Sequence, residues 1–230
     1  MLPKKYKTDD GKALLYNIYF PDSYGKKDSK TPLFLFLHGA GERGDDNKSS
    51  LVHVVPYITS SEIQSKYAAV VVVPQCPKED YWAPVKRFEW VIINNGQVTE
   101  AMKDVMLLLD KLLKDPNIDK SRVYVSGLSM GGFGTYDLLS RRPDIFAGGA
   151  VICGGADYGK MSHYRHIPLW VFHGAKDEVV PVQFSRDFVK MRNDSGAYTR
   201  YTEYPEGKHD VWNEAIRDLD LLPWLFTQRK

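Results

Sequence analysis

The stretch that decides the fold runs over residues 123–132 and reads Val123-Tyr124-Val125-Ser126-Gly127-Leu128-Ser129-Met130-Gly131-Gly132. It begins as an apolar run typical of a buried strand, and the residues after it predict a helix. Between the two stands Gly-x-Ser-x-Gly, centred on Ser129. In a tight strand-to-helix turn this pattern projects a serine hydroxyl above the sheet, and the glycines remove side chains that would collide. A nucleophilic serine is one interpretation; a serine that only caps a helix is the alternative.

The rest of the chain alternates strand-like apolar runs with longer helical stretches, which indicates a mostly parallel sheet covered by helices on both faces. Including an antiparallel hairpin start around the turn Asp9-Asp10-Gly11, about eight strands are expected. The later strands are predicted at 33–37, 68–74, 123–126, 147–152, 168–172 and 198–204. Helices are predicted over 98–113, from Phe184 to Met191, and over 211–222, where Pro223 interrupts. Their apolar stripes, which include Met191 and Leu219, are expected in the core.

Length and composition favour a single globular α/β domain over residues 1–230. The 230 residues are 43% hydrophobic and 26% charged, and no linker or internal repeat divides them. The formal net charge of +2 creates no strong field toward nucleic acid or an anionic membrane. Apolar runs such as 33–37 fall far short of the roughly 20 residues that span a bilayer. Neither nucleic acid nor a membrane is therefore expected as a partner.

The N-terminal residues bear on localisation. Met1-Leu2-Pro3-Lys4-Lys5 has no apolar stretch behind its charges, so it does not resemble a secretory signal peptide. A cytoplasmic protein is expected from the chain as given. A secreted or periplasmic protein that had lost its leader would look the same, so these locations stay open, as does the oligomeric state.

A serine hydroxyl is a weak nucleophile, so a base and an orienting carboxylate should follow it in the chain. His209 is the only histidine well beyond a suitable acid, and it comes after the last predicted strand. Asp177 is the expected acid, with its neighbour Glu178 as the alternative. Asp177 should accept the Nδ1 proton of His209, which leaves Nε2 free to receive the serine proton. His38 and His173 end strands as His-Gly pairs and are expected to brace loops.

The negative oxygen of a tetrahedral intermediate needs backbone N–H donors. Met130, directly after the serine, is expected to supply one donor. The second is assigned to Ala40, with Gly41 as the alternative, in the loop His38-Gly39-Ala40-Gly41-Glu42-Arg43-Gly44. Its glycines match a dinucleotide-binding pattern superficially, but the rest of the chain assigns the loop to an oxyanion hole. No cofactor is expected, and no His/Cys/Asp cluster has a credible spacing for metal ligands.

Together these segments resemble the esterase branch of the α/β-hydrolases over about residues 6–224. The motifs that carry the resemblance are the loop 38–47, Val73-Pro74-Gln75-Cys76-Pro77, the serine turn, His173-Gly174-Ala175-Lys176-Asp177 and Gly207-Lys208-His209-Asp210-Val211-Trp212. They are similar to phospholipase/carboxylesterase-like, "predicted peptidase" and polyhydroxybutyrate-depolymerase-like enzymes, whose relatives include acetyl xylan and feruloyl esterases of carbohydrate esterase family one. The resemblance implies a serine carboxylic ester hydrolase with Ser129, Asp177 and His209 as its catalytic triad.

The expected substrates are short-chain acyl esters, or feruloyl or acetyl esters, of plant polysaccharides. Short connections, such as 153–167, leave no room for a large lid, so a bulky alcohol could enter. Trp82 and Trp212 are candidates to stack on a sugar or an aromatic acyl group, and the alternative is that they pack beside the site. Residues 75–96 form an irregular stretch rich in aromatics, including Phe88 and Trp90, of the kind that is often functional.

Three other readings remain open. Prolyl-oligopeptidase-like serine peptidases share the triad, but they usually add a propeller domain that 230 residues cannot hold. Dienelactone hydrolases share the fold but normally use cysteine where this chain has Ser129. A catalytically silent homologue could bind a ligand in the same pocket. The family's strand order also places two strands between those that precede Cys76 and Cys153, so free thiols are expected.

Overall fold

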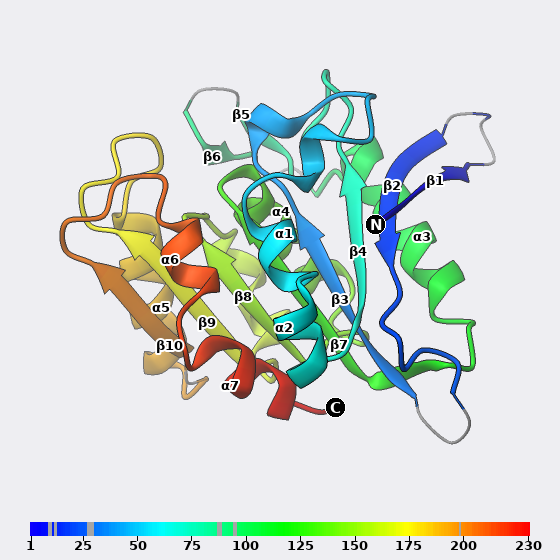
Figure 1. Cartoon of the computed structure of the whole chain (residues 1–230). Coiled ribbons are helices and arrows are strands. Elements are labelled where there is room, and N and C mark those ends of the chain that lie inside the picture. The colour runs from blue at the N-terminus through cyan, green and yellow to red at the C-terminus, as the bar shows by residue number, and fades with distance from the viewer. Residues whose placement is uncertain (9–10, 12, 27–29, 87–88, 94–95, 198) are drawn as a thin grey trace.

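The computed structural model describes residues 1–230 except 9–10, 12, 27–29, 87–88, 94–95 and 198. Its centre is an eight-stranded sheet in the order β1-β2-β4-β3-β7-β8-β9-β10 (Figure 1). The strands are β1 Leu2–Lys7, β2 Ala13–Tyr19, β3 Thr31–Leu37, β4 Val70–Gln75, β7 Ile118–Leu128, β8 Gly148–Ile152, β9 Leu169–Gly174 and β10 Thr199–Tyr204. Neighbours from β4 to β10 all run parallel, whereas β2 runs antiparallel to both β1 and β4. The predicted sheet is confirmed.

The central strands are buried on both faces, which explains their continuous apolar sequences. Every residue of β3 is buried. Leu33, Leu35 and Leu37 belong to the apolar core on one side of the sheet, and Phe34 and Phe36 to the core on the other. Because side chains alternate along a strand, one uninterrupted apolar run supplies both cores.

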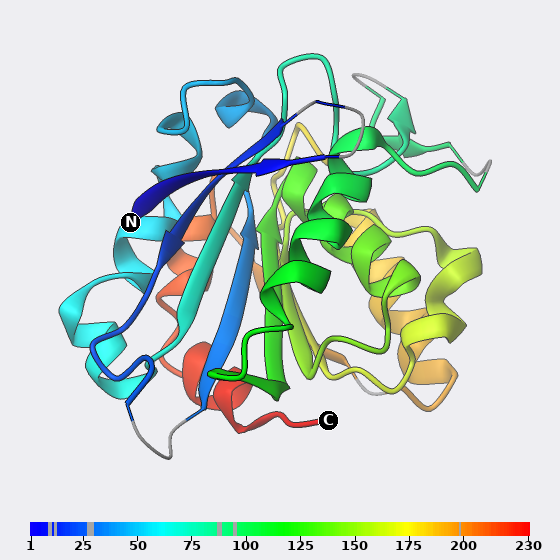
Figure 2. The same ribbon diagram turned by 90° about the vertical axis from the view of Figure 1, so that its right-hand side faces the viewer.

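Helices cover both faces of the sheet, and Figure 2 shows the three layers from the side. One face carries α1 Val54–Ile58, α2 Ser61–Lys66, α6 Trp212–Ile216 and α7 Leu221–Thr227. The other carries α3 Glu100–Leu112, α4 Met130–Arg141 and α5 Gln183–Asp194. The connections contain the 3-10 helices η1 Ala40–Glu42, η2 Ser49–Leu51 and η3 Tyr158–Tyr164, and the hairpin β5 Val85–Lys86 and β6 Val91–Ile92. No helix in the described part of the chain is long and apolar enough to span a membrane.

The C-terminal helix prediction is wrong in two respects. The expected helix over 211–222 is two helices, because α6 ends at Ile216 and α7 begins at Leu221. Pro223 does not interrupt a helix, since it lies in the first turn of α7, where its missing N–H has no intrahelical partner to lose. Leu219 lies in the link and is 89% exposed, and Met191 lies off the buried face of α5 and is 41% exposed. Neither belongs to the core.

The structure gives the outcome for two further predictions, the N-terminal hairpin and the irregular stretch 75–96. β1 and β2 form the expected antiparallel start of the sheet, while Asp9 and Asp10 of the expected turn lie outside the described residues. The stretch 75–96, expected to be irregular, contains the hairpin β5–β6. Phe88 lies outside the described residues. The hairpin stands at the edge where the parallel strands end (Figure 1).

The two cysteines are free, as predicted. Cys76 follows β4 and Cys153 follows β8, and β3 and β7 lie between these strands. Both side chains are fully buried. Burial raises the pKa of both thiols well above the ordinary value, because it penalises the charged thiolate.

We therefore expect the native protein to resist thiol reagents, since the thiolate is the reactive form and both sulfurs are inaccessible. After denaturation, both thiols should react quickly. Titration with a chromogenic disulfide reagent, with and without guanidinium, measures this directly. The structure would be contradicted if two thiols per chain reacted quickly in the native protein, or if no thiol reacted in the denatured protein.

Candidate active site

Ser129 stands at the junction of β7 and α4. Its backbone has φ 51° and ψ −118°, a conformation that is strained for a residue with a side chain. Its N–H donates to the carbonyl of Ile152 in β8 at 2.8 Å. Its own carbonyl accepts from the N–H groups of Gly132 and Phe133 at 2.8 and 3.1 Å. The neighbouring strand and the first helical turn thus hold the serine in the strand–turn–helix arrangement that the sequence predicts.

The flanking glycines are explained by close backbone contacts. A Cβ on Gly131 would lie 1.9 Å from the carbonyl oxygen of Leu37, at the end of β3. A Cβ on Gly127 would lie 2.2 Å from the carbonyl oxygen of Gly131. Only glycine therefore lets α4 approach β3 and β7 this closely.

The structure brings Ser129, His209 and Asp177 together. Nε2 of His209 lies 2.9 Å from Ser129 Oγ, and its Nδ1 lies 2.7 Å from Asp177 Oδ2. Asp177 follows β9, and His209 follows β10. A ring nitrogen that faces a carboxylate carries the proton, so Nδ1–H donates to Asp177 and Nε2 accepts from the Ser129 hydroxyl. Glu178, the alternative acid, is exposed.

The carboxylate of Asp177 is fully buried and receives four hydrogen bonds. The N–H groups of Val179 and Val180 donate to Oδ1 at 2.8 and 2.9 Å. His209 and His173 face Oδ2 at 2.7 and 3.2 Å. Burial by itself would raise the pKa of Asp177, but the hydrogen bonds from His173, His209 and Val180 outweigh it and hold the pKa well below the usual range. Asp177 is therefore ionised at neutral pH.

Both ring nitrogens of His173 are hydrogen-bonded to protein groups. Its Nε2 lies 3.0 Å from the carbonyl oxygen of Val180 and 3.2 Å from Asp177 Oδ2, and both are acceptors. Nε2 therefore carries the proton, and Nδ1 accepts from the hydroxyl of Ser185 at 2.7 Å. The expected bracing of a loop is present, but the contact with the acid is new. The four-residue spacing of His173 and Asp177 is the only sequence signal that points to it.

The same region holds a cluster of metal-ligand types. Within the described residues, Cys153, His173 and Asp177 offer ligand atoms within 4.8 Å of one another. The thiol of Cys153 donates to the carbonyl oxygen of His209 at 3.4 Å, and both nitrogens of His173 are hydrogen-bonded to protein groups. These atoms form a hydrogen-bonded network around the acid.

The loop after β3 passes directly beside the serine. A Cβ on Gly39 would lie 3.8 Å from the Cβ of Ser129. Arg43 fixes the loop from outside, because its Nε donates to the carbonyl of Ala40 at 2.9 Å. Gly39 thus borders the serine, and Ala40 follows it in the loop. The assignment of the N–H groups of Ala40 and Met130 as oxyanion donors, with Gly41 as the alternative, stays a prediction.

His38 anchors the start of that loop, as expected. Burial lowers the pKa of His38 to about 4, so its ring is neutral at physiological pH. Its Nε2 accepts from the N–H of Cys76 at 3.0 Å, and its Nδ1–H donates to the carbonyl of Gly39 at 2.6 Å. The loop is thereby tied to the end of β4.

The two tryptophans predicted to contact substrate, Trp82 and Trp212, differ in burial. Trp82 is fully buried, and its Nε1–H donates to the carbonyl of His38 at 3.0 Å. A Cβ on Gly134 would lie 2.3 Å from the Cβ of Trp82, so this residue is packed against α4. The prediction that Trp82 contacts substrate is therefore wrong, and the alternative of structural packing holds. Trp212 is half-buried and lies edge-on to His209, with ring centroids 5.6 Å apart; its contact with substrate stays a prediction.

Residues 24–221 match the model of the phospholipase/carboxylesterase family. This chain belongs to the phospholipase/carboxylesterase family. Over 205 residues, this family member is 29% identical to a bifunctional acetylxylan esterase/xylanase of Neocallimastix patriciarum, with 87% of this chain and 27% of that protein covered. It is 22% identical over 205 residues to the carboxylesterase SOBER1 of Arabidopsis thaliana, covering 81% and 86% of the two chains.

A crystal structure of a thermostable esterase superposes on this carboxylesterase-family chain with a TM-score of 0.90 and 34% identity. The superposition covers 100% of this chain and 63% of that one. This chain therefore spans less than two thirds of that structure and only 27% of the bifunctional relative. The predicted α/β-hydrolase fold is confirmed, and the described connections contain no large lid.

We expect Gly131→Ala to destabilise the fold by about 3 kcal/mol or more, because its methyl group would meet a backbone oxygen that cannot move aside. Gly41→Ala is the matched control, since no described atom lies within 4 Å of its Cβ position. The control should change stability by no more than about 0.5 kcal/mol. Urea unfolding of both variants measures the difference, and equal midpoints would refute the contact.

Proposed function

We propose that this protein is a serine carboxylic ester hydrolase that works through an acyl-enzyme, with residues 1–230 acting as one domain. The observation that carries the proposal is the continuous hydrogen-bonded row from Ser129 Oγ through His209 to the buried carboxylate of Asp177. Membership of the phospholipase/carboxylesterase family supports the ester as the bond that is cleaved. The proposed substrates are short-chain acyl, or feruloyl or acetyl, esters of plant polysaccharides. The acetylxylan activity named for one relative supports this class.

In the first half-reaction Ser129 Oγ bonds to the ester carbonyl carbon while its proton passes to Nε2 of His209. The tetrahedral intermediate then breaks its bond to the alcohol, and His209 returns the proton to the departing oxygen. In the second half-reaction a water molecule gives a proton to His209 and attacks the acyl group. Ser129 leaves with that proton restored, and the carboxylic acid is released. No cofactor takes part.

Asp177 and the oxyanion donors supply the electrostatic part of the proposal. The ionised Asp177 stabilises His209 while the imidazole carries a second proton, and it keeps Nε2 directed at the serine. The N–H groups of Met130 and Ala40 would receive the negative oxygen of the intermediate. Losing one such donor typically lowers kcat by about 10²–10³-fold. Trp212, next to His209 at the surface, is proposed to contact the alcohol or the acyl group.

We expect Ser129→Ala to lower ester turnover by about 10⁴-fold or more, because no nucleophile remains. Ser126→Ala is the matched control: this buried hydroxyl in β7, three residues before Ser129, has no hydrogen-bond partner among the described residues. Hydrolysis of p-nitrophenyl acetate, butyrate and octanoate, methyl ferulate and acetylated xylan is the measurement. Full activity of Ser129→Ala would refute the triad. A wild type that cleaves peptides faster than all of these esters would identify a serine peptidase, and binding without turnover a silent homologue.

His173 is proposed as a positioning residue, because it donates to the same oxygen of Asp177 that orients His209. We expect His173→Phe to lower kcat by about tenfold to a hundredfold, with a smaller change in KM, since a hydrogen bond to a charged group contributes about 1.5–3 kcal/mol. His173→Gln keeps an N–H donor near the Nε2 position and should restore much of kcat.

The downfield proton NMR signal of His209 Nδ1–H gives a second readout for His173. It should shift in the Phe variant and return toward its original position in the Gln variant. An unchanged signal in the Phe variant, or equal losses of kcat in both variants, would mean that His173 only supports the fold.

A further inference from the structure

An apolar cavity lies beside the proposed triad. Its volume is about 180 Å³, and we call it the aromatic pocket. The side chains of Trp90, Ile92, Phe133, Tyr158 and Phe184 line it, together with the backbone of Gly155. Trp90 and Ile92 come from the β5–β6 hairpin region, whereas Phe133 and Phe184 belong to α4 and α5. The hairpin region and these two helices therefore form the pocket together.

Several walls of the aromatic pocket are continuous with the segments that carry the triad. Phe133 lies one helical turn after Ser129, and its N–H donates to the serine carbonyl at 3.1 Å. Val180, whose N–H binds the carboxylate of Asp177, belongs to the same small apolar cluster as Phe133, with Trp90 and Phe184 packed against it. The aromatic pocket therefore adjoins the segments that hold Ser129 and Asp177.

The ring arrangement suits a flat aromatic guest. Trp90 and Phe133 are stacked, with centroids 5.5 Å apart and planes 25° apart. Phe184 stands edge-on to Phe133, with planes 87° apart. Offset-stacked and edge-to-face contacts are the arrangements that aromatic rings prefer. The hydroxyl of Tyr158 is already bound to the carbonyl of Phe184 at 3.1 Å, which leaves a predominantly apolar lining.

Gly155 makes room for the two phenylalanine rings that form walls of the aromatic pocket. A Cβ there would lie 2.7 Å from Cε1 of Phe133 and 3.0 Å from Cδ2 of Phe184. The volume of 180 Å³ is close to the roughly 150 Å³ of an engineered apolar cavity that binds benzene. An aromatic ring therefore fills the pocket, whereas an acetyl group leaves most of it empty.

The hairpin residue Trp90 is held under strain. Its φ of 52° is an outlier for a bulky side chain, and such outliers persist where the surroundings enforce them, often at ligand sites. Its neighbour Val91, which also lines the pocket, is 51% exposed, so this part of the rim is apolar as well. The hairpin stands at the carboxyl-end edge of the sheet, where the triad lies (Figure 1).

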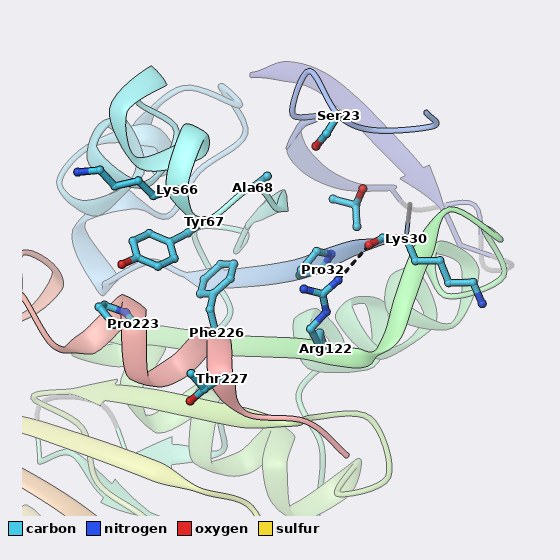
Figure 3. Close-up of a pocket in the computed structure, with 11 residues that line it drawn as sticks. Ser23, Lys30, Pro32, Lys66, Tyr67, Ala68, Arg122, Pro223, Phe226 and Thr227 are labelled. Carbon is cyan, nitrogen blue, oxygen red and sulfur yellow. Dashed lines mark hydrogen bonds between the residues drawn. The ribbon is translucent and has the colours of Figure 1, made fainter. Parts of the chain in front are cut away.

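A larger cavity, about 460 Å³, lies at the opposite end of the sheet, where β3 begins (Figure 3). Basic residues line it, but Lys30 and Lys66 extend in different directions away from its centre. Arg122 is bound to Asp119 and to the carbonyl of Lys30. The basic side chains of this larger cavity therefore do not point at one common ligand position. The rings of the aromatic pocket, in contrast, surround one space.

We propose that the aromatic pocket binds the ring of the acyl group, so that the substrates of this protein are esters of aryl acids with a short spacer between ring and carbonyl, such as phenylpropenoates. This inference rests on the proposed esterase function. Of the acyl groups proposed there, it favours the aromatic feruloyl type over acetyl. Trp90 and Phe133 contact the ring, and the carbonyl carbon lies at Ser129.

The test compares p-nitrophenyl cinnamate with p-nitrophenyl acetate, which share one leaving group. In Gly155→Ala the ratio of kcat/KM for cinnamate over acetate should fall at least about tenfold, because single methyl groups in apolar pockets change selectivity by about 10–200-fold. Gly159→Ala, in the neighbouring helix η3, is the matched control and should leave the ratio unchanged. An unchanged ratio in Gly155→Ala, with both esters cleaved, would overturn the pocket assignment and leave the esterase function standing.

A binding measurement keeps the test independent of turnover. Calorimetric titration of Ser129→Ala protein with methyl cinnamate should give a Kd that weakens at least about tenfold when Trp90→Leu or Gly155→Ala is added. Equal affinity in all three proteins would overturn the inference. If the wild type cleaves no ester, the proposed function fails, and this titration still decides what the aromatic pocket binds.

Discussion

The site depends first on the strained backbone of Ser129. The cost of that conformation is offset by the hydrogen bond to Ile152 and by the close approach of α4 to β3, which Gly127 and Gly131 permit. Because these contacts come from three adjacent strands, the position of the serine is set by the sheet itself. The loop that carries Ala40 leaves β3 beside it, which explains why the proposed oxyanion donors and the nucleophile share one end of the fold.

A second constraint is the buried charge of Asp177. A carboxylate without solvent is stable only when donors surround it, and here two backbone N–H groups and two histidines do so. His173 and His209 have different roles in this network. His173 is locked between Asp177, Val180 and Ser185, whereas His209 reaches outward to Ser129. One histidine thus holds the acid in place, and the other connects the acid to the serine.

In our proposal, the hairpin β5–β6 sets the selectivity for the acyl group without a large lid. It lies in a connection between strands, so it can vary without disturbing the sheet. By laying Trp90 against Phe133, it turns the first turn of α4 into a wall of the aromatic pocket. The same helix therefore presents the serine at its start and a ring contact one turn later. Proposed chemistry and proposed recognition are coupled through a single element.

The sequence by itself determined the parallel sheet, the turn at Ser129 and the order in which Asp177 and His209 follow it, because apolar periodicity and tight turns depend on residues adjacent in the chain. Pro223 misled the prediction of the last helix, since its effect depends on its position within a turn. Only the tertiary structure decided the burial of Trp82, the contact of His173 with Asp177 and the pocket around Trp90. The burial of Trp82 and the pocket around Trp90 join side chains from separate elements, and such packing leaves no period or spacing in the sequence. His173 and Asp177 are only four residues apart, but their contact depends on how the chain turns back after β9, which that spacing alone does not determine.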